Sequence, residues 1–256
     1  MEKSASIITI GNEILKGRTV NTNFAVIGRM LTFSGYRVRR GYICEDSPEE
    51  IAEVFRDAVS KSDLVVSSGG LGPTFDDMTV DSVAKAFSLK MVRNDHIALI
   101  IRNHYTSLNV PVTPEREKMS MVPEGSRIIE NPVGSAPGVV LDIDKCRIIL
   151  LPGVPTEMEA LLSLARDEYV SDRTYCEKSS IFENMMESTL APEITRIMRK
   201  YDGRVYIKSH PLNTEGTLPR IDVEVSAYSD DLDHCTKLVK DVMDEIKRSS
   251  EKLVGR

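Results

Sequence analysis

The sequence is poor in the residues that metal cages and disulfide frameworks require: its 256 residues include four cysteines, four histidines and no tryptophan. Cys44, Cys146, Cys176 and Cys235 are scattered and show no Cys-x-x-Cys spacing, which argues against a zinc site and against a set of disulfides. We therefore expect four reduced cysteines with a structural role. The histidines lack the partner spacing of a catalytic triad or a metal cage, so none is assigned as a catalytic base.

Long hydrophobic runs are also missing, because no segment approaches the roughly 20 continuous apolar residues that span a bilayer. The first six residues lack the form of a signal peptide. A net charge of −6 argues against broad electrostatic binding to nucleic acid. With 41% hydrophobic and 28% charged residues, the composition is that of a globular protein. We expect it to be cytoplasmic and to bind a small molecule rather than nucleic acid or a membrane.

Strand and helix patterns alternate through residues 1–170. Apolar strands are predicted at 6–10, 36–44 and 64–67, separated by helices at 22–31 and 47–60. The second of these helices opens with Ser47-Pro-Glu-Glu, the pattern of a capping box. Further helices are predicted at 96–108, 114–121 and 156–169, and further strands at 127–130, 138–143 and 146–151. This alternation predicts an α/β fold with a mostly parallel sheet and helices on both faces.

A change in composition near Ser171 predicts a second, smaller α+β domain over residues 171–256. Its predicted strands lie at 180–186, 205–208 and 220–228, with a helix opened by Pro192 and a last helix that follows an acidic cap at 229–231. The resulting βαββα order predicts a small sheet with two helices packed on one face.

The most informative segment is the glycine-rich loop 68–79, which follows the strand predicted at 64–67. Its glycines, Gly69, Gly70 and Gly72, let the backbone approach a ligand closely, and their amides can form an anion cradle. The simpler interpretation is a tight turn between a strand and a helix. Asp76 and Asp77 can hold a cation such as Mg²⁺ through oxygen ligands, or can cap the next helix.

Other candidate loops also follow predicted strands. Gly11, Asn12 and Glu13 follow the first strand, and Pro152 and Gly153 follow the last strand of the larger domain. Ligands of open α/β sheets bind at the edge formed by the carboxyl ends of the strands, so these loops predict one shared site. Asn21 and Asn23 at the next helix start are interpreted either as caps or as contacts to a ribose or phosphate. The loop 131–138 is a further candidate.

Five motifs carry a resemblance to a known family. They are Gly11-Asn-Glu-Ile-Leu-x-Gly17, Asn21-Thr-Asn23, Gly69-Gly-Leu-Gly-Pro-Thr-x-Asp-Asp-x-Thr79, Asn131-x-x-Gly-Ser-Ala-Pro-Gly138 and Leu151-Pro-Gly-Val-Pro-x-Glu-Met158. In this order they resemble the CinA family, the competence/damage-inducible protein A group, whose N-terminal domain is similar to the molybdopterin-binding domain of MoaB, MogA and MoeA. The segment after about residue 171 resembles, less specifically, the small KH-like domain of CinA.

The resemblance implies a three-layer α/β fold and a metal-dependent hydrolase of ADP-ribose, which releases AMP and ribose 5-phosphate with Mg²⁺, Mn²⁺, Co²⁺ or Ni²⁺. Asp76 and Asp77 would act at the metal, with Glu13 as a further catalytic carboxylate. The resemblance places Gly69, Gly70, Gly72 and Thr74 at the phosphate and Asn131, Ser135 and Gly153 in the lining of the pocket. To these we add, as candidate ligand-binding residues of the same motifs, Gly11, Asn12, Asn23, Gly134, Gly138, Pro152 and Glu157. A homodimer is also implied, because relatives are commonly dimeric.

Two alternatives stay open. Binding loops alone would suit a pterin or nucleotide carrier without turnover, related to molybdenum-cofactor biosynthesis proteins. RNA binding through a KH-like domain is a weaker interpretation, because the Gly-x-x-Gly loop of KH domains has no clear counterpart and the segment Asn213-Thr-Glu-Gly216 is acidic. Many CinA proteins continue into a domain that deamidates nicotinamide mononucleotide. The 256 residues contain no segment assigned to that domain, so this activity is not expected.

Overall fold

The computed structural model describes residues 2–212 and 218–254. The acidic segment Asn213–Gly216 lies outside these residues. The chain forms two compact units, which are described separately: a larger unit of residues 1–32 and 36–170, and a smaller unit of residues 33–35 and 171–256. None of the described helices is both long and apolar enough to cross a membrane.

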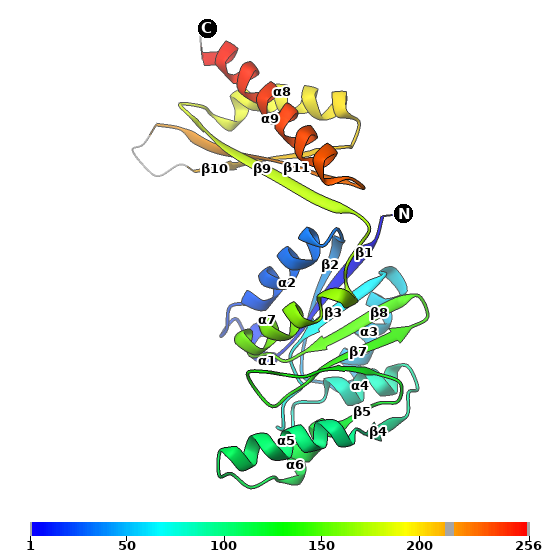
Figure 1. Ribbon diagram of the computed structural model, residues 1–256. Helices are drawn as coiled ribbons and strands as arrows, with labels where there is room; N and C mark the ends of the chain where they lie inside the picture. The colour runs from blue at the N-terminus through cyan, green and yellow to red at the C-terminus, as the bar shows by residue number, and fades with distance from the viewer. Residues whose placement is uncertain (1, 213–217, 255–256) are drawn as a thin grey trace. The chain divides into compact units, whose positions relative to one another are not determined.

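A six-stranded sheet forms the centre of the larger unit, with the strand order β2-β1-β3-β8-β7-β6 (Figure 1). Its strands are β1 (Ser4–Ile10), β2 (Arg37–Cys44), β3 (Leu64–Ser68), β6 (Arg127–Ile129), β7 (Gly138–Ile143) and β8 (Cys146–Leu151). β2, β1, β3 and β8 pair in parallel, whereas β7 runs antiparallel to both of its neighbours. The prediction of an α/β fold with a mostly parallel sheet is therefore confirmed.

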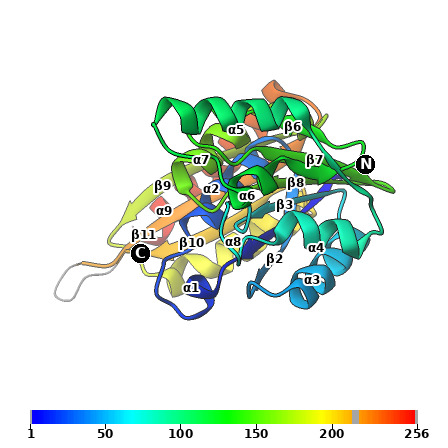
Figure 2. The same cartoon turned by 90° about the horizontal axis from the view of Figure 1, so that it is seen from below.

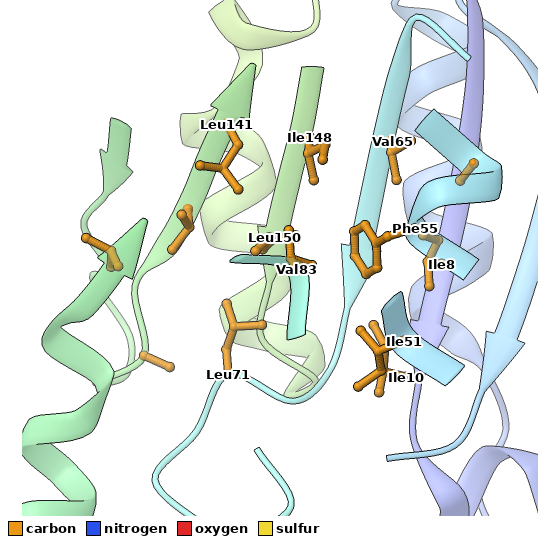
Figure 3. Close-up of a cluster of buried hydrophobic side chains, with 14 of the residues drawn as sticks. Ile8, Ile10, Ile51, Phe55, Val65, Leu71, Val83, Leu141, Ile148 and Leu150 are labelled. Carbon is orange, nitrogen blue, oxygen red and sulfur yellow. The ribbon is translucent and has the colours of Figure 1, made fainter. Parts of the chain in front are cut away.

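Helices cover both faces of this sheet, because neighbouring strand residues point to opposite sides. Ile8 packs in the core formed with α3 (Pro48–Lys61) and α4 (Thr79–Ala86), and Figure 3 shows this core from Ile8 and Phe55 across to Leu150. Ile7 packs in the opposite core, formed with α2 (Thr22–Phe33) and α7 (Pro155–Leu164). The three layers can be followed in Figure 2. Every residue of β3 is buried, as expected for a strand covered on both faces.

An insertion between α4 and β6 extends the larger unit. It contains β4 (Met91–Arg93), α5 (Asp95–Ser107), α6 (Pro114–Glu117), the 3₁₀ segment η1 (Lys118–Ser120) and β5 (Met121–Pro123). β4 and β5 form an antiparallel pair, so the start and end of the insertion are tied together. We refer to residues 91–123 as the β4–β5 insertion.

The smaller unit has the predicted βαββα order. It consists of β9 (Thr174–Glu183), α8 (Glu187–Tyr201), β10 (Tyr206–Pro211), β11 (Arg220–Ser229) and α9 (Leu232–Val254). The three strands form an antiparallel sheet in the order β10-β11-β9, and both helices contribute to one hydrophobic core with it. Its likeness to a KH domain stays a prediction.

Several predicted elements differ from the structure at their ends. Ser47 does precede α3, but its hydroxyl donates to the Glu49 carboxylate at 3.2 Å and makes no capping bond to the helix backbone. Glu13 lies in a short helix, α1 (Asn12–Leu15), rather than in a loop. Pro192 lies inside α8 instead of opening it. A proline there removes one hydrogen bond, to the carbonyl of Ser188, and that residue is exposed to water.

The helix predicted at 156–169 ends at Leu164, and a 3₁₀ segment follows at Arg166–Glu168. Tertiary contacts explain the change, because Arg147 donates to the Glu168 carbonyl at 3.0 Å and Arg127 pairs with the Glu168 carboxylate. The strand predicted at 180–186 instead spans Thr174–Glu183. All ten of its residues pair with β11. This pairing explains why the strand includes the mostly polar residues 174–179, which an apolar pattern does not predict.

Candidate functional site

The carboxyl ends of three parallel strands meet at one edge of the larger unit's sheet. β1 ends at Ile10, and the registers place Thr9 beside Ser68 and Ser68 beside Leu151. A cavity of about 380 Å³ opens at this edge, within the range of small-molecule sites. It is lined by Ile10, Gly11, Glu13, Asp46, Gly69, Gly70, Leu71, Gly72, Pro73, Thr74, Asp76, Asp77, Ser135, Ala136, Pro152, Gly153, Val154 and Glu157.

The glycine loop has the geometry of a tight strand-to-helix turn. Gly69 and Gly70 have φ of 117° and 69°, a region that side chains disfavour. A Cβ at Gly69 would lie 2.1 Å from the Ile10 carbonyl oxygen, and one at Gly70 would lie 2.2 Å from the Thr79 hydroxyl. That hydroxyl donates to the Gly69 carbonyl at 2.9 Å. These two glycines are thus required by packing, and they also line the cavity.

Asp76 and Asp77 converge on Thr74 rather than capping α4. Asp77 Oδ2 accepts from the Thr74 amide at 2.8 Å and from its hydroxyl at 2.7 Å, and the same hydroxyl contacts Asp76. The residue preceding α4 is Met78, which makes no capping bond through its side chain. A Cβ at Gly72 would lie 2.6 Å from Asp77 Oδ2, so glycine there leaves room for the carboxylate.

A third carboxylate, that of Glu13, lies close to the backbone of Gly11, as Asp77 does to Gly72. A Cβ at Gly11 would lie 2.7 Å from Glu13 Oε1. Asp46, which sequence analysis missed, also lines the cavity and accepts from the Asn12 amide at 2.9 Å. Burial, together with repulsion from Glu13, Asp76 and Asp77, raises the pKa of Asp46, although the bond from Asn12 opposes the shift. Asp46 lies two residues after β2. It could have been predicted as a site residue, because ligands of open α/β sheets bind at the carboxyl ends of the strands.

The loop 131–138 positions one further carboxylate, that of Glu157 in the first turn of α7. The Asn131 amide donates to Glu157 at 2.6 Å and to the Ala136 carbonyl at 2.8 Å, and its oxygen accepts from the Gly134 amide at 2.9 Å. A Cβ at Gly134 would lie 2.3 Å from the Glu157 carboxyl carbon. Asn131 therefore holds Glu157 through a hydrogen bond, and glycine at position 134 leaves room for the Glu157 carboxylate.

Asn23 ties two of the site loops together. It is buried, and its amide donates to the Ser68 hydroxyl at 2.7 Å and to the Gly153 carbonyl at 2.9 Å. Ser68 in turn donates to the Pro152 carbonyl at 3.1 Å. Of the predicted site residues, those outside the cavity lining are Asn12, Asn23, Asn131, Gly134 and Gly138.

Two residues of the β4–β5 insertion contact the site from outside its predicted motifs. The Tyr105 hydroxyl lies 3.0 Å from the Ser135 hydroxyl, and Ser135 lines the cavity. Lys118 Nζ donates to the carbonyls of Thr74 and Asp77. Both contacts join segments far apart in the sequence, so no local pattern could have revealed them.

The cavity lining is acidic. Among its 18 described residues are five carboxylates, Glu13, Asp46, Asp76, Asp77 and Glu157, and no lysine, arginine or histidine. Within the described part of the chain, no three Asp, Glu, His or Cys residues are grouped closely enough to hold a metal ion by themselves. Mg²⁺ usually takes one or two carboxylates together with water and substrate phosphates. Asp76 and Asp77 fit that partial set of ligands.

Comparisons with known proteins identify the family of the chain. A family model described as "Probable molybdopterin binding domain" matches residues 6–169. Protein Ta0487 of Thermoplasma acidophilum is 46% identical over 254 residues, covering 99% of this chain and 98% of that protein. A crystal structure of CinA, of unknown function, from Thermoplasma acidophilum is 50% identical with a TM-score of 0.62, covering 66% of this chain and 99% of that one. MoaB of Thermus thermophilus has 19% identity and a TM-score of 0.45, covering 64% and 89%.

Proposed function

Because the chain belongs to the family of probable molybdopterin binding domains and is CinA-like, we propose that its cavity binds a phosphorylated small molecule. We propose further that it hydrolyses the pyrophosphate of ADP-ribose, or of a related dinucleotide, with the help of a divalent metal. The products would be AMP and ribose 5-phosphate.

One observation carries this proposal: five carboxylates surround a cavity whose described lining contains no basic side chain. A pyrophosphate would be repelled by such a lining, since like charges at close range are unfavourable. Asp76 and Asp77 would hold a divalent cation, and such a cation would offset this repulsion. The same cavity also exposes backbone of the glycine loop, which can donate to phosphate oxygens.

The residues suggest a division of labour. Asp77, with Asp76 beside it, would hold the metal, which when bound neutralises charge on the phosphates and lowers the pKa of water. Glu13 is the first candidate for a general base, and Asp46 is the second, since both line the cavity. A water molecule adds to one phosphorus as the bond from that phosphorus to the bridging oxygen breaks. The water gives one proton to the carboxylate, and each product carries one phosphate away.

Turnover of ADP-ribose, FAD and nicotinamide mononucleotide by the purified protein, with Mg²⁺, Mn²⁺, Co²⁺ or Ni²⁺, tests the proposal. Products are separated by chromatography. We expect AMP from ADP-ribose with at least one metal. Absence of AMP with every metal would sink the hydrolase proposal.

The informative variant is Asp77→Asn, because an asparagine oxygen can still accept from the Thr74 amide while the charge is lost. Asp81→Asn is its matched control, since Asp81 is exposed on α4 and lies outside the lining of this cavity. We expect turnover to fall by about a thousandfold in the first variant and to persist in the second.

A second candidate function is binding without turnover, which the description of the matching family as a molybdopterin binding domain favours. In that case the carboxylates would set affinity alone. A calorimetric titration with ADP-ribose and with a pterin distinguishes the two: a protein that binds either ligand and releases no AMP is a carrier.

A further inference from the structure

Lys118 reaches from the β4–β5 insertion to the glycine loop. Its ammonium donates to the Thr74 carbonyl at 2.6 Å and to the Asp77 carbonyl at 2.9 Å. The side chain is half-buried and lines a second, small cavity beside Asp77 and Asp81. The same Thr74 carbonyl also accepts from the Asp77 amide at 3.2 Å. One ammonium therefore contacts the backbone on both sides of the acid pair.

These two contacts fix the orientation of two peptide planes. A trans peptide unit is rigid, so a carbonyl directed at Lys118 orients the amide of the following residue away from it. The affected units join residues 74–75 and 77–78, and Asp76 and Asp77 lie between them. The Asp77 carboxylate is then held by the Thr74 amide at 2.8 Å. The two hydrogen bonds from Lys118 come from a charged donor and are therefore stronger than hydrogen bonds between neutral groups.

We propose that Lys118 is a positioning residue, which holds Asp76 and Asp77 in the arrangement that takes the divalent cation. This inference rests on the proposed metal-dependent function. Lys118 acts through the loop backbone, because its two hydrogen bonds go to the carbonyls of Thr74 and Asp77 and not to the carboxylates.

The sign of the effect separates positioning from simple electrostatics. An ammonium beside a cation site repels the cation, so if its charge alone mattered, its removal would tighten metal binding. If Lys118 positions the carboxylates, its removal weakens metal binding, because the loop must then be ordered at the moment the metal binds.

The test compares Lys118→Met, Lys118→Arg and Lys90→Met with the wild type. Lys90 is the matched control, since it lies just before the same insertion, is exposed and pairs with Glu124 at 3.4 Å. Binding of Mn²⁺ alone is measured by electron paramagnetic resonance, and the Mn²⁺ dependence of ADP-ribose hydrolysis is measured in parallel. Backbone hydrogen exchange of residues 71–79 reports on loop order.

We expect Lys118→Met to raise the half-saturating Mn²⁺ concentration about tenfold, consistent with the loss of hydrogen bonds from a charged group. Exchange of residues 71–79 should accelerate while the sheet stays protected. Lys118→Arg, which keeps charged donors, should recover part of the Mn²⁺ affinity, and Lys90→Met should match the wild type. If Lys118→Met fails to fold, Lys118→Gln takes its place with one neutral donor group.

Unchanged or tighter Mn²⁺ binding in Lys118→Met would overturn the inference, and so would faster exchange without any change in Mn²⁺ affinity. A wild type that binds Mn²⁺ but releases no AMP with any of the four metals would refute the hydrolase proposal, while the variants still decide the role of Lys118. A wild type that binds no Mn²⁺ and releases no AMP with any of the four metals would refute both.

Discussion

The two units differ in whether carboxylates gather around one cavity without a basic residue in its described lining. In the larger unit, five carboxylates face one cavity, from the segments that follow β1, β2 and β3 and from the first turn of α7. In the smaller unit, charged residues pair with each other at the surface, as Glu245 does with Arg196 and Lys200. Parallel strands bring their carboxyl ends to one edge, whereas neighbouring antiparallel strands end at opposite edges. Strand direction thus explains why the predicted site lies in the larger unit.

The strongest test of this contrast removes one charge from each unit. We expect Asp77→Asn to reduce ADP-ribose hydrolysis by about a thousandfold, in line with the loss of one group that stabilises transition-state charge. Glu183→Gln, which removes an acid paired with Arg220 in the smaller unit, should leave the rate unchanged. Steady-state kinetics measures both. Equal losses in the two variants would break the assignment of the site to the larger unit.

Alanine substitutions at one glycine in each unit compare the backbone constraints of the two units. Gly70→Ala in the larger unit places a Cβ 2.2 Å from the Thr79 hydroxyl at a φ of 69°, and we expect a cost of about 3 kcal/mol. Gly203→Ala in the smaller unit has a similar φ of 73° but no atom within 4 Å, and we expect a cost of about 1 kcal/mol. Denaturant unfolding measures the difference. Equal costs would show that φ alone, and not the close approach, requires Gly70.

Alkaline pH should weaken the larger unit through its buried thiols. Burial raises the pKa of Cys44 and of Cys146 from about 9 to about 12. The folded unit therefore holds these protons more tightly than the unfolded chain, and this stability is complete below about pH 9 and is lost as the pH rises toward 12. Hydrogen exchange of β1 and β3 measured over that range should show the loss. It should diminish in a variant with both cysteines replaced by alanine.

The smallest expected effect comes from the surface network of the smaller unit. Lys200, and then Arg196, lower the pKa of Glu245. The stability that this shift provides is present above the ordinary glutamate pKa and is lost as the pH falls through the lowered value. Glu245→Gln should cost less than about 1 kcal/mol at pH 7 and should reduce the acid sensitivity of the smaller unit. Thermal melts at about pH 7 and about pH 3 provide the measurement, and a larger cost would show that the pair acts as a buried one.

Local patterns predicted most elements, and their failures have physical reasons. The strand at β3 and the helix at α3 follow from an apolar run and from a proline after Ser47, both of which act over a few residues. The end of α7 depends on Arg127 and Arg147, which lie in distant strands, so the local apolar pattern ran too far. The internal Pro192 is tolerated because the carbonyl left without its partner belongs to an exposed residue.

The site shows the same limits. Glu13 could be found because it follows β1 closely, and Asp76 and Asp77 because they lie in the glycine-rich loop after β3. The structure places all three on one cavity. Asn23 and Asn131 were predicted as ligand contacts, but their amides are engaged with neighbouring loops and with Glu157. A sequence motif marks a residue as part of a site, but it does not distinguish a residue that lines the cavity from one that holds a lining residue in place. Contact of Asn23 and Asn131 with a ligand stays a prediction.

The sequence by itself determined the alternation of strands and helices, the glycines that permit left-handed backbone, and the acids beside them, because these depend on a residue and its near neighbours. The tertiary structure alone decided which polar groups line the cavity and which hydrogen-bond to the lining residues. Asp46, Tyr105 and Lys118 join the site through contacts across 30 or more residues. Such contacts exist only after the parallel strands have brought their carboxyl ends together at one edge of the sheet.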